Sequence, residues 1–221
     1  MASLKVMSID IGIINLGFVY TNVTFPDLSK TCKYKNKILN KSYITNNYIS
    51  IIDCNRIDIT KIKHSSVSFC DCKLHHERCI PDYLDHFIQE YSKYFAECDI
   101  LLLERQPPIG ITNVQDLLFT RFREKVLLIS PNSVHKYFGL SSEYLVRKIE
   151  SEKIAGEYLT NFKSFTTNDR KHDISDALLM VLYYYKTKMD SHIEKTEYVN
   201  DLVDFEQFRF NFFTNNDLLK K

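Results

Sequence analysis

The chain opens with Leu4-Lys-Val-Met-Ser-Ile-Asp10-Ile-Gly12, an apolar run that ends in an aspartate and a turn glycine. A second run, rich in aromatic and β-branched residues, follows from Leu16 to Val23, and a third strand is expected from Tyr48 to Cys54. These runs predict a fold that begins with a hairpin of short strands around a tight turn. In that arrangement Asp10 closes the first strand.

Working outward from this hairpin, the next strong signal is Ile100-Leu-Leu-Leu103, which runs into Glu104 and is halted by Pro107 and Pro108. Continuous apolar residues without alternation are typical of a strand that is buried on both faces of a sheet. A carboxylate that finishes such a run is unusual without a partner or a ligand. Arg105, the next residue, is one candidate partner.

The remaining pattern alternates strand and helix. Apolar spacing predicts helices over about 81–96, 112–123, 132–138 and 142–162, another buried strand from Lys125 to Ser130, and a strongly apolar helix from Asp173 to Lys186. Strands that alternate with helices after an opening hairpin predict an α/β fold, with a mixed sheet flanked by helices.

Composition excludes several classes of protein. The 221 residues include 29 Lys plus Arg and 28 Asp plus Glu, a net charge of +1 that gives no global attraction to a polyanion. No stretch is long and apolar enough for a membrane span, and the first ten residues lack the apolar core of a secretory signal, so we expect an intracellular protein without membrane contact. The length suits one core over residues 1–189 with a tail over 190–221.

Four carboxylates stand out by position: Asp10, Glu104, Asp173 and Asp176. Strand ends and a helix start can meet at one sheet edge, and acids three residues apart share a helical face. Clustered carboxylates repel one another unless divalent cations neutralise them, and Mg²⁺ prefers carboxylate, water and phosphate oxygens. Two such ions can activate water and stabilise the leaving oxygen of a phosphodiester. The simpler alternative makes Asp10 a turn residue, and Asp173 and Asp176 first-turn acids of a helix.

A cysteine and histidine cluster lies in Cys70-Asp-Cys72-Lys-Leu-His75-His76-Glu-Arg-Cys79. Its density suits structural Zn²⁺, because thiolate and imidazole are ligands that this ion favours. The expected ligands are Cys70, Cys72, His75 and Cys79, with His76 or His64 as substitutes. The alternative is a polar loop that contains a few free thiols.

Three motifs together carry a family resemblance. Ser8-Ile-Asp10-Ile-Gly12-Ile-Ile-Asn15-Leu-Gly-Phe18, Leu101-Leu-Leu-Glu104-Arg-Gln106-Pro107 and His172-Asp173-Ile-Ser-Asp176-Ala177 resemble the RuvC-like Holliday-junction resolvases, and most of all the poxvirus branch found in large DNA viruses. The opening Asp-x-Gly-x-x-Asn-Leu is also similar to that of the fungal mitochondrial resolvases. The resemblance implies a ribonuclease-H-like fold with a five-stranded mixed sheet. It also implies a homodimer that nicks four-way DNA junctions symmetrically with Mg²⁺, or with Mn²⁺ as a substitute, during viral recombination or concatemer processing, at the viral replication site in the host.

The resemblance also implies roles for single residues. Asp10 would bridge two metal ions, Glu104 would hold one, and Asp173 with Asp176 would complete the shell. The family lysine corresponds to Lys148, with Lys171 as the alternative; for both, an ordinary solvated surface position is the competing interpretation. Two stretches look like insertions relative to the family core, a Lys-rich one at about 24–42 and the possible zinc knuckle at about 62–80.

Because the net charge is small, DNA contact is expected to depend on local basic patches. The expected DNA-binding residues are Arg121, Arg123, Lys136, Arg147, Arg170 and Lys171. Three other functions compete with a resolvase: another ribonuclease-H-like nuclease, an actin-like phosphotransferase, and a non-catalytic zinc-bearing adaptor that binds nucleic acid or protein. The five glycines are few for the phosphate loops of a phosphotransferase.

Overall fold

The computed structural model describes residues 2–26, 48–62 and 79–191. Within these ranges a five-stranded sheet has the strand order β3-β2-β1-β4-β5. Strands β1 to β3 are antiparallel neighbours, and β4 and β5 run parallel to β1. The strands are β1 (Ala2–Asp10), β2 (Leu16–Phe25), β3 (Ile49–Ile57), β4 (Ile100–Glu104) and β5 (Val126–Ile129). This is the predicted opening hairpin followed by a mixed sheet.

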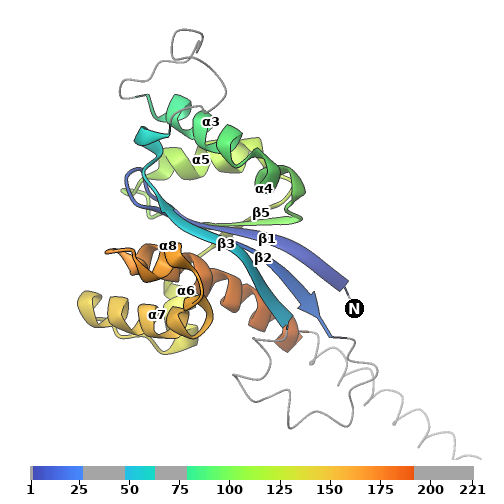
Figure 1. Cartoon of the computed structure of the whole chain (residues 1–221), viewed down its shortest axis with the longest axis vertical. Coiled ribbons are helices and arrows are strands. Elements are labelled where there is room, and N and C mark those ends of the chain that lie inside the picture. Colours follow the sequence, from blue (N-terminus) through green and yellow to red (C-terminus); the bar gives the residue numbers. More distant parts are fainter. Residues whose placement is uncertain (1, 27–47, 63–78, 192–221) are drawn as a thin grey trace, which may run out of the picture.

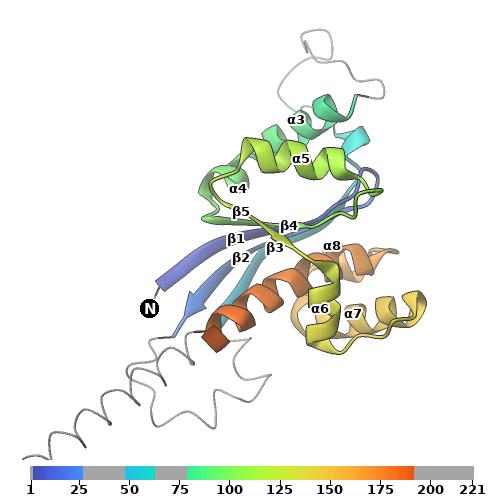
Figure 2. The ribbon, with the colours of Figure 1, turned by 180° about the vertical axis from the view of Figure 1, so that it is seen from behind.

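The helices form a layer on each face of the sheet, as Figures 1 and 2 show. One layer holds α3, α4 and α5, and the other holds α6, α7, α8 and a long helix over residues 171–191. The bounds are α3 (Ile80–Glu90), α4 (Ser92–Glu97), α5 (Thr112–Arg121), α6 (Pro131–Phe138), α7 (Tyr144–Leu159) and α8 (Lys163–Thr166), with a 3-10 turn η2 (Ile59–Lys61) after β3. Each layer covers its own apolar core.

Successive side chains of β1 point alternately into these two cores. Met7 and Ile9 belong to the core beneath α3 to α5, whereas Val6 belongs to the core beneath the helix 171–191. Because successive side chains of a strand point to opposite faces, Asp10 shares the face of Val6. Glu104 shares the face of Leu102, which belongs to the same core as Val6. The two strand-end acids therefore lie on one face of the sheet.

Several predicted boundaries differ from the observed ones. The last helix, predicted over 173–186, runs over 171–191, and the helix predicted over 112–123 ends at Arg121. Further differences involve two helices and one strand. The single helix predicted over 81–96 is two helices, because the backbone at Tyr91 leaves helical geometry (φ −100°, ψ 24°) where its ring packs edge-on against Phe18, 4.9 Å between centroids. The helix predicted over 142–162 ends at Leu159, and the chain turns before α8. Strand β3 continues to Ile57, three residues beyond the predicted Cys54, because its pairing with β2 extends to Leu16.

Some predictions fall outside the described residues. Most of the two proposed insertions, the expected zinc ligands Cys70, Cys72 and His75, and the tail from 192 onward are in this category. Cys79 is described: it directly precedes α3, is partly exposed and carries a free thiol. No helix within the three described ranges is long and apolar enough to cross a membrane.

Candidate active site

Asp10 is the last residue of β1, at the edge where a tight turn leads into β2. Gly12 makes that turn feasible, because a Cβ there would lie 2.3 Å from the carbonyl oxygen of Asn15. The Asn15 side chain accepts a hydrogen bond from Arg56 Nη1 at 3.1 Å, which ties the turn to the end of β3. The close packing at Gly12 and the hydrogen bond from Arg56 therefore hold the turn, and with it Asp10, in place.

Glu104 closes β4 directly beside Asp10. The parallel pairing of Ile9 with Leu103 brings the next residue of each strand to the same sheet edge. The Glu104 carboxylate accepts a hydrogen bond from Gln106, whose Nε2 donates at 2.5 Å. The side chain of Arg105, the partner considered from the sequence, is exposed instead. Glu104 is therefore oriented by a neutral amide rather than neutralised by a cation.

The third acid comes from the helix 171–191, which lies against β2. A Cβ at Gly17 would meet the carbonyl oxygen of Asp173 at 2.0 Å, so this close approach requires glycine. Gly17 is paired with Asp10 in the antiparallel register, and the helix start is therefore brought next to the end of β1. One turn along this helix, Asp176 reaches the carboxylates of the strands.

Lys148 on α7 forms an ion pair with Asp176, with Nζ 2.7 Å from Oδ2. Burial works against the charge of this ammonium, but the attraction of Asp176, its hydrogen bond and the nearby Asp10 together raise the pKa of Lys148. The lysine therefore stays charged at neutral pH. Lys171, the alternative predicted from the family, instead lies over the ring of Phe165 at 5.8 Å.

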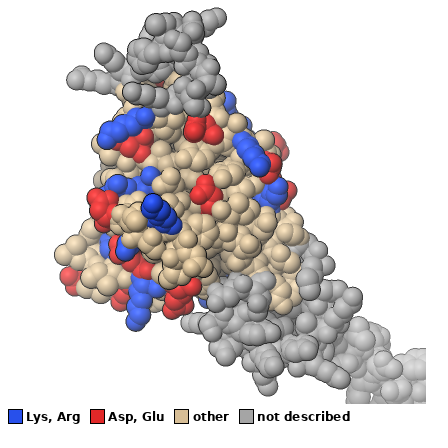
Figure 3. Space-filling view, in the orientation of Figure 1, with Lys and Arg blue, Asp and Glu red and all other residues tan. Residues whose placement is uncertain are grey.

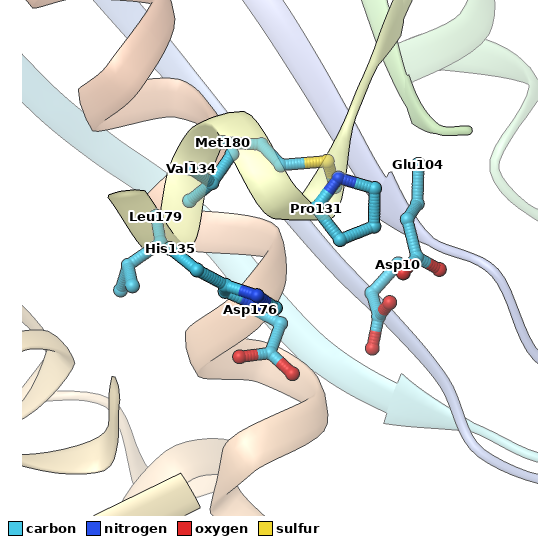
Figure 4. A pocket seen from close by; sticks show the side chains of 8 residues that line it. All are labelled: Asp10, Glu104, Pro131, Val134, His135, Asp176, Leu179 and Met180. Atoms are coloured by element: carbon cyan, nitrogen blue, oxygen red, sulfur yellow. The ribbon is translucent and has the colours of Figure 1, made fainter. Parts of the chain in front are cut away.

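The acids line a small open pocket, shown in Figure 4. Asp10 and Glu104 lie side by side at the strand ends, and Asp176 faces them from the helix 171–191. The remaining wall is formed by Pro131, Val134, His135, Leu179 and Met180. His135 was not predicted as a site residue, because α6 carries no motif of the predicted family.

The pocket raises the proton affinity of its two strand-end acids, Asp10 and Glu104. Burial, followed by the charges of Glu104 and Asp176 and a hydrogen bond to Glu104, raises the pKa of Asp10 well above its ordinary value. Burial and the charge of Asp176 also raise the pKa of Glu104, although hydrogen bonds from Asp10, Gln106 and the backbone partly offset this. Without a compensating cation, the charged form of this site is electrostatically unfavourable.

Asp173, the fourth predicted acid, does not line the pocket. Its side chain is only 7% exposed and pairs with Arg170, whose Nε lies 3.0 Å from Oδ2. His172 Nε2 approaches the other carboxylate oxygen at 3.3 Å. The structure therefore brings three of the four predicted acids together and places Asp173 one turn away, with its own partners.

The donor set fits a hard divalent cation in its chemistry. All three acids offer carboxylate oxygens, the ligand type that Mg²⁺ prefers, and their mutual repulsion is what a cation would relieve. Among the described residues, no three His, Cys, Asp or Glu side chains already form a closed metal-binding group. The fit is therefore one of donor type and charge rather than of completed coordination.

The predicted DNA-binding residues divide into two groups. Arg121, paired with Asp85 at 2.5 Å, and Arg123, over the ring of Phe119 at 5.4 Å, precede β5. Because β5 is parallel to β4, the start of β5 lies at the sheet edge opposite Glu104. By contrast, Lys136 follows the pocket residue His135, and Arg147 neighbours Lys148.

Arg170 and Lys171 immediately precede the acidic turn of the helix 171–191. They therefore belong to the group near the pocket. On the face seen in Figure 3, basic side chains are interspersed with acidic ones rather than gathered into one patch. On this face, a negatively charged partner would contact separate basic side chains rather than one continuous basic patch.

Comparison with known proteins supports the fold. No protein-family model matches the chain, and no curated protein matches it. The Fowlpox virus resolvase, solved with Holliday junction DNA, aligns with a TM-score of 0.55 at 16% identity, over 84% of this chain and 99% of that one. The Fowlpox virus Holliday junction resolvase solved separately gives 0.53 at 16% identity, over 83% and 99%. The predicted ribonuclease-H-like fold, in the form found in the poxvirus resolvases, is thereby confirmed.

Proposed function

We propose that this protein is a structure-selective endonuclease that cleaves four-way DNA junctions by metal-assisted hydrolysis. The observation that carries this proposal is the meeting of Asp10, Glu104 and Asp176, from three separate elements, in one open pocket. The fold adds support, because the Fowlpox virus resolvase that shares it is solved with Holliday junction DNA. Fold by itself does not determine substrate, so the proposal depends on the site.

The reaction would be phosphodiester hydrolysis. The oxygen of a water molecule forms a bond to phosphorus, one P–O bond of the backbone breaks, and the leaving oxygen gains a proton. Asp10, Glu104 and Asp176 would hold one or two Mg²⁺ ions, which when bound supply a more acidic water and charge stabilisation. Lys148, held 2.7 Å from Asp176, places a positive charge where the extra negative charge of the transition state develops.

Asp173 would take part only after a local change. Its carboxylate is engaged by Arg170, so contact with a cation would require this ion pair to be exchanged. A cation competes well for a carboxylate when other acids already lie nearby. We therefore assign Asp173 a supporting role beside the three acids that line the pocket.

Resolution of a four-way junction also requires two cuts on symmetrically placed strands, and the described pocket supplies a single site. A homodimer with two such pockets would provide both cuts, consistent with the preference of soluble proteins for two-fold assemblies.

A structural Zn²⁺ at Cys70, Cys72, His75 and Cys79 remains part of this proposal, with Cys79 placed at the start of α3. The absence of zinc from the purified protein, measured by elemental analysis, would contradict the zinc site.

The test compares substrates and variants. The full chain is incubated with Mg²⁺ and labelled four-way, flap, RNA/DNA hybrid and linear duplex substrates. We expect paired cuts on the four-way junction alone. Asp10→Asn should lower the rate by more than about 10³-fold while junction binding stays measurable, since one carboxylate is lost and the surface is kept. Asp116→Asn, on the exposed side of α5, is the matched control and should cut normally.

Other outcomes favour other functions. Cleavage of the hybrid in preference to the junction would favour another ribonuclease-H-like nuclease. Metal-independent junction binding without cleavage would favour an adaptor, and turnover of ATP would favour a phosphotransferase. Undiminished cleavage by Asp10→Asn would remove this residue from the mechanism.

A further inference from the structure

One pocket residue has no role in the proposed reaction so far. His135 lies on α6, which begins at Pro131 immediately after β5 and therefore starts from the same sheet edge as Glu104. Figure 4 shows its ring directed toward Asp176 across the pocket from the strand-end acids. His135 lines the same pocket as the three carboxylates.

The local structure fixes where His135 points. The preceding residue, Val134, is 4% exposed and belongs to the core beneath the helix 171–191. At its other end α6 stops at Gly139, which adopts φ 66° and closes the helix with backbone bonds to His135 and Lys136. The helix is therefore anchored through Val134 and closed at Gly139, which holds the backbone of His135 at the pocket wall.

The chemistry of the eight lining residues is uneven. Three are carboxylates, which only accept hydrogen bonds when ionised, and four are apolar. His135 is the member of this set with an N–H to donate. Three of the donors near the pocket already have partners: Lys148 pairs with Asp176, Gln106 donates to Glu104, and Arg170 pairs with Asp173. Within the described part of the chain the imidazole makes no hydrogen bond.

The imidazole keeps at least one N–H donor in either of its protonation states. An unused donor beside three acids suits a ligand that carries only acceptor oxygens, as a phosphodiester does.

We propose that His135 is a further catalytic residue of this site, donating a hydrogen bond from its imidazole N–H to a non-bridging oxygen of the scissile phosphodiester. This inference rests on the proposed nuclease function and extends it to a residue outside the acidic motifs. The bond would orient the phosphate against the carboxylates and stabilise the charge that builds on its oxygens during attack.

The experiment measures single-turnover cleavage of a labelled four-way junction by the full chain with Mg²⁺. His135→Ala should slow cleavage by about 10² to 10³-fold, the usual effect of losing one donor to a developing oxyanion. His135→Gln, which keeps an N–H donor, should recover the rate to within about tenfold of wild type. Asn132→Ala, on the exposed side of the same helix, is the matched control and should cut like wild type.

Two further measurements separate this role from a structural one. Junction affinity measured with Ca²⁺ in place of Mg²⁺, and the rise in melting temperature on adding Mg²⁺, should be the same for wild type and His135→Ala. A loss of Mg²⁺ stabilisation in His135→Ala would overturn the proposal, because the residue would then act by holding Asp176. Wild-type cleavage by His135→Ala, or no recovery in a folded His135→Gln, would also overturn it.

Failure of the proposed function itself looks different. In that case wild-type protein cuts none of the branched substrates, and the inference is overturned together with the function. If wild type cuts and Asp10→Asn does not, the nuclease assignment stands, and the comparison of His135→Ala with His135→Gln decides the inference alone.

Discussion

The two faces of the sheet are built for different purposes. Beneath α3, α4 and α5 the core is aromatic and closed: Phe87, fully buried, packs edge-on against Phe95 at 5.5 Å and tilted against Tyr91 at 5.3 Å. The opposite face, beneath the helix 171–191, ends at its edge in three carboxylates and an open pocket. Aromatic burial of this kind contributes strongly to stability, whereas clustered acids oppose it.

Some buried polar groups also lie on the carboxylate face. Ser8 and Thr21 are fully buried on the carboxylate face, and their hydroxyls make no hydrogen bond with any residue that the structure describes. Unsatisfied hydroxyls cost stability, as do acids whose pKa is raised by burial. The comparison teaches that both faces of the sheet supply an apolar core, whereas the acids of the pocket lie at the end of one face alone among the described residues.

The largest expected effect breaks activity on the carboxylate face. Glu104→Gln should lower the junction cleavage rate by about 10⁴-fold, because a ligand of the proposed cation is lost. Its free energy of unfolding without metal should not fall, since a repulsive charge is removed. Glu90→Gln, at the exposed end of α3, is the control and should cleave within about twofold of wild type. Cleavage by Glu104→Gln at the wild-type rate would contradict the proposal that the carboxylate face carries the reaction.

The next effect breaks stability on the aromatic face. Phe87→Ala should lower the free energy of unfolding by about 3 to 5 kcal/mol, because a fully buried ring leaves a cavity. Phe87→Leu, closer in volume, should cost less than about 1.5 kcal/mol. Denaturant unfolding measures both. The fraction of Phe87→Ala that remains folded should cleave junctions normally, and a selective loss of its rate would show that the faces are coupled.

A smaller effect tests the contact that joins β2 to the helix 171–191. Gly17→Ala places a Cβ 2.0 Å from the carbonyl oxygen of Asp173, so the helix must shift and should lose about 1 to 3 kcal/mol of stability. The shift also moves Asp176, so cleavage should fall together with stability. Gly156→Ala is the matched control: it meets nothing within 4 Å inside α7 and should stabilise by about 0.5 to 1 kcal/mol.

The smallest effect is a pH dependence in EDTA. Burial and neighbouring acids raise the pKa of Asp10, so folded wild type loses stability as pH rises from the unfolded pKa of about 3.9 through the folded one. Asp10→Asn removes that loss. The variant should therefore be more stable than wild type at pH 7, by about 1.4 kcal/mol for each unit of the shift, and the gain should vanish near pH 4. A gain that is constant with pH would contradict it.

Much of the fold could be predicted because it depends on local patterns. The apolar runs that end in Asp10 and Glu104 predicted both strand ends, and these residues do lie side by side. Boundaries were less accurate where tertiary contacts intervene: Tyr91 breaks a continuous helical pattern because its ring packs on Phe18 from another element.

Pairing between side chains could not be read in the same way. Lys148 competed with Lys171 as the family lysine, and only the packing of α7 places Lys148 within 2.7 Å of Asp176. The predicted DNA contacts Arg121 and Arg123 lie at the opposite sheet edge, a fact set by the parallel course of β5. The helix predicted over 112–123 is equally compatible with either edge when only the sequence is considered.

The amino-acid sequence by itself determined the α/β class, the strand ends and the identity of the acids, because hydrophobic periodicity and chain breaks act over a few neighbouring residues. The tertiary structure alone decided which side chains share the pocket. It placed Asp173 outside the pocket, in an ion pair with Arg170. It also placed His135, which belongs to none of the family motifs, in the pocket wall. The physical reason is that such contacts depend on how helices pack across a sheet, which is the sum of many distant interactions.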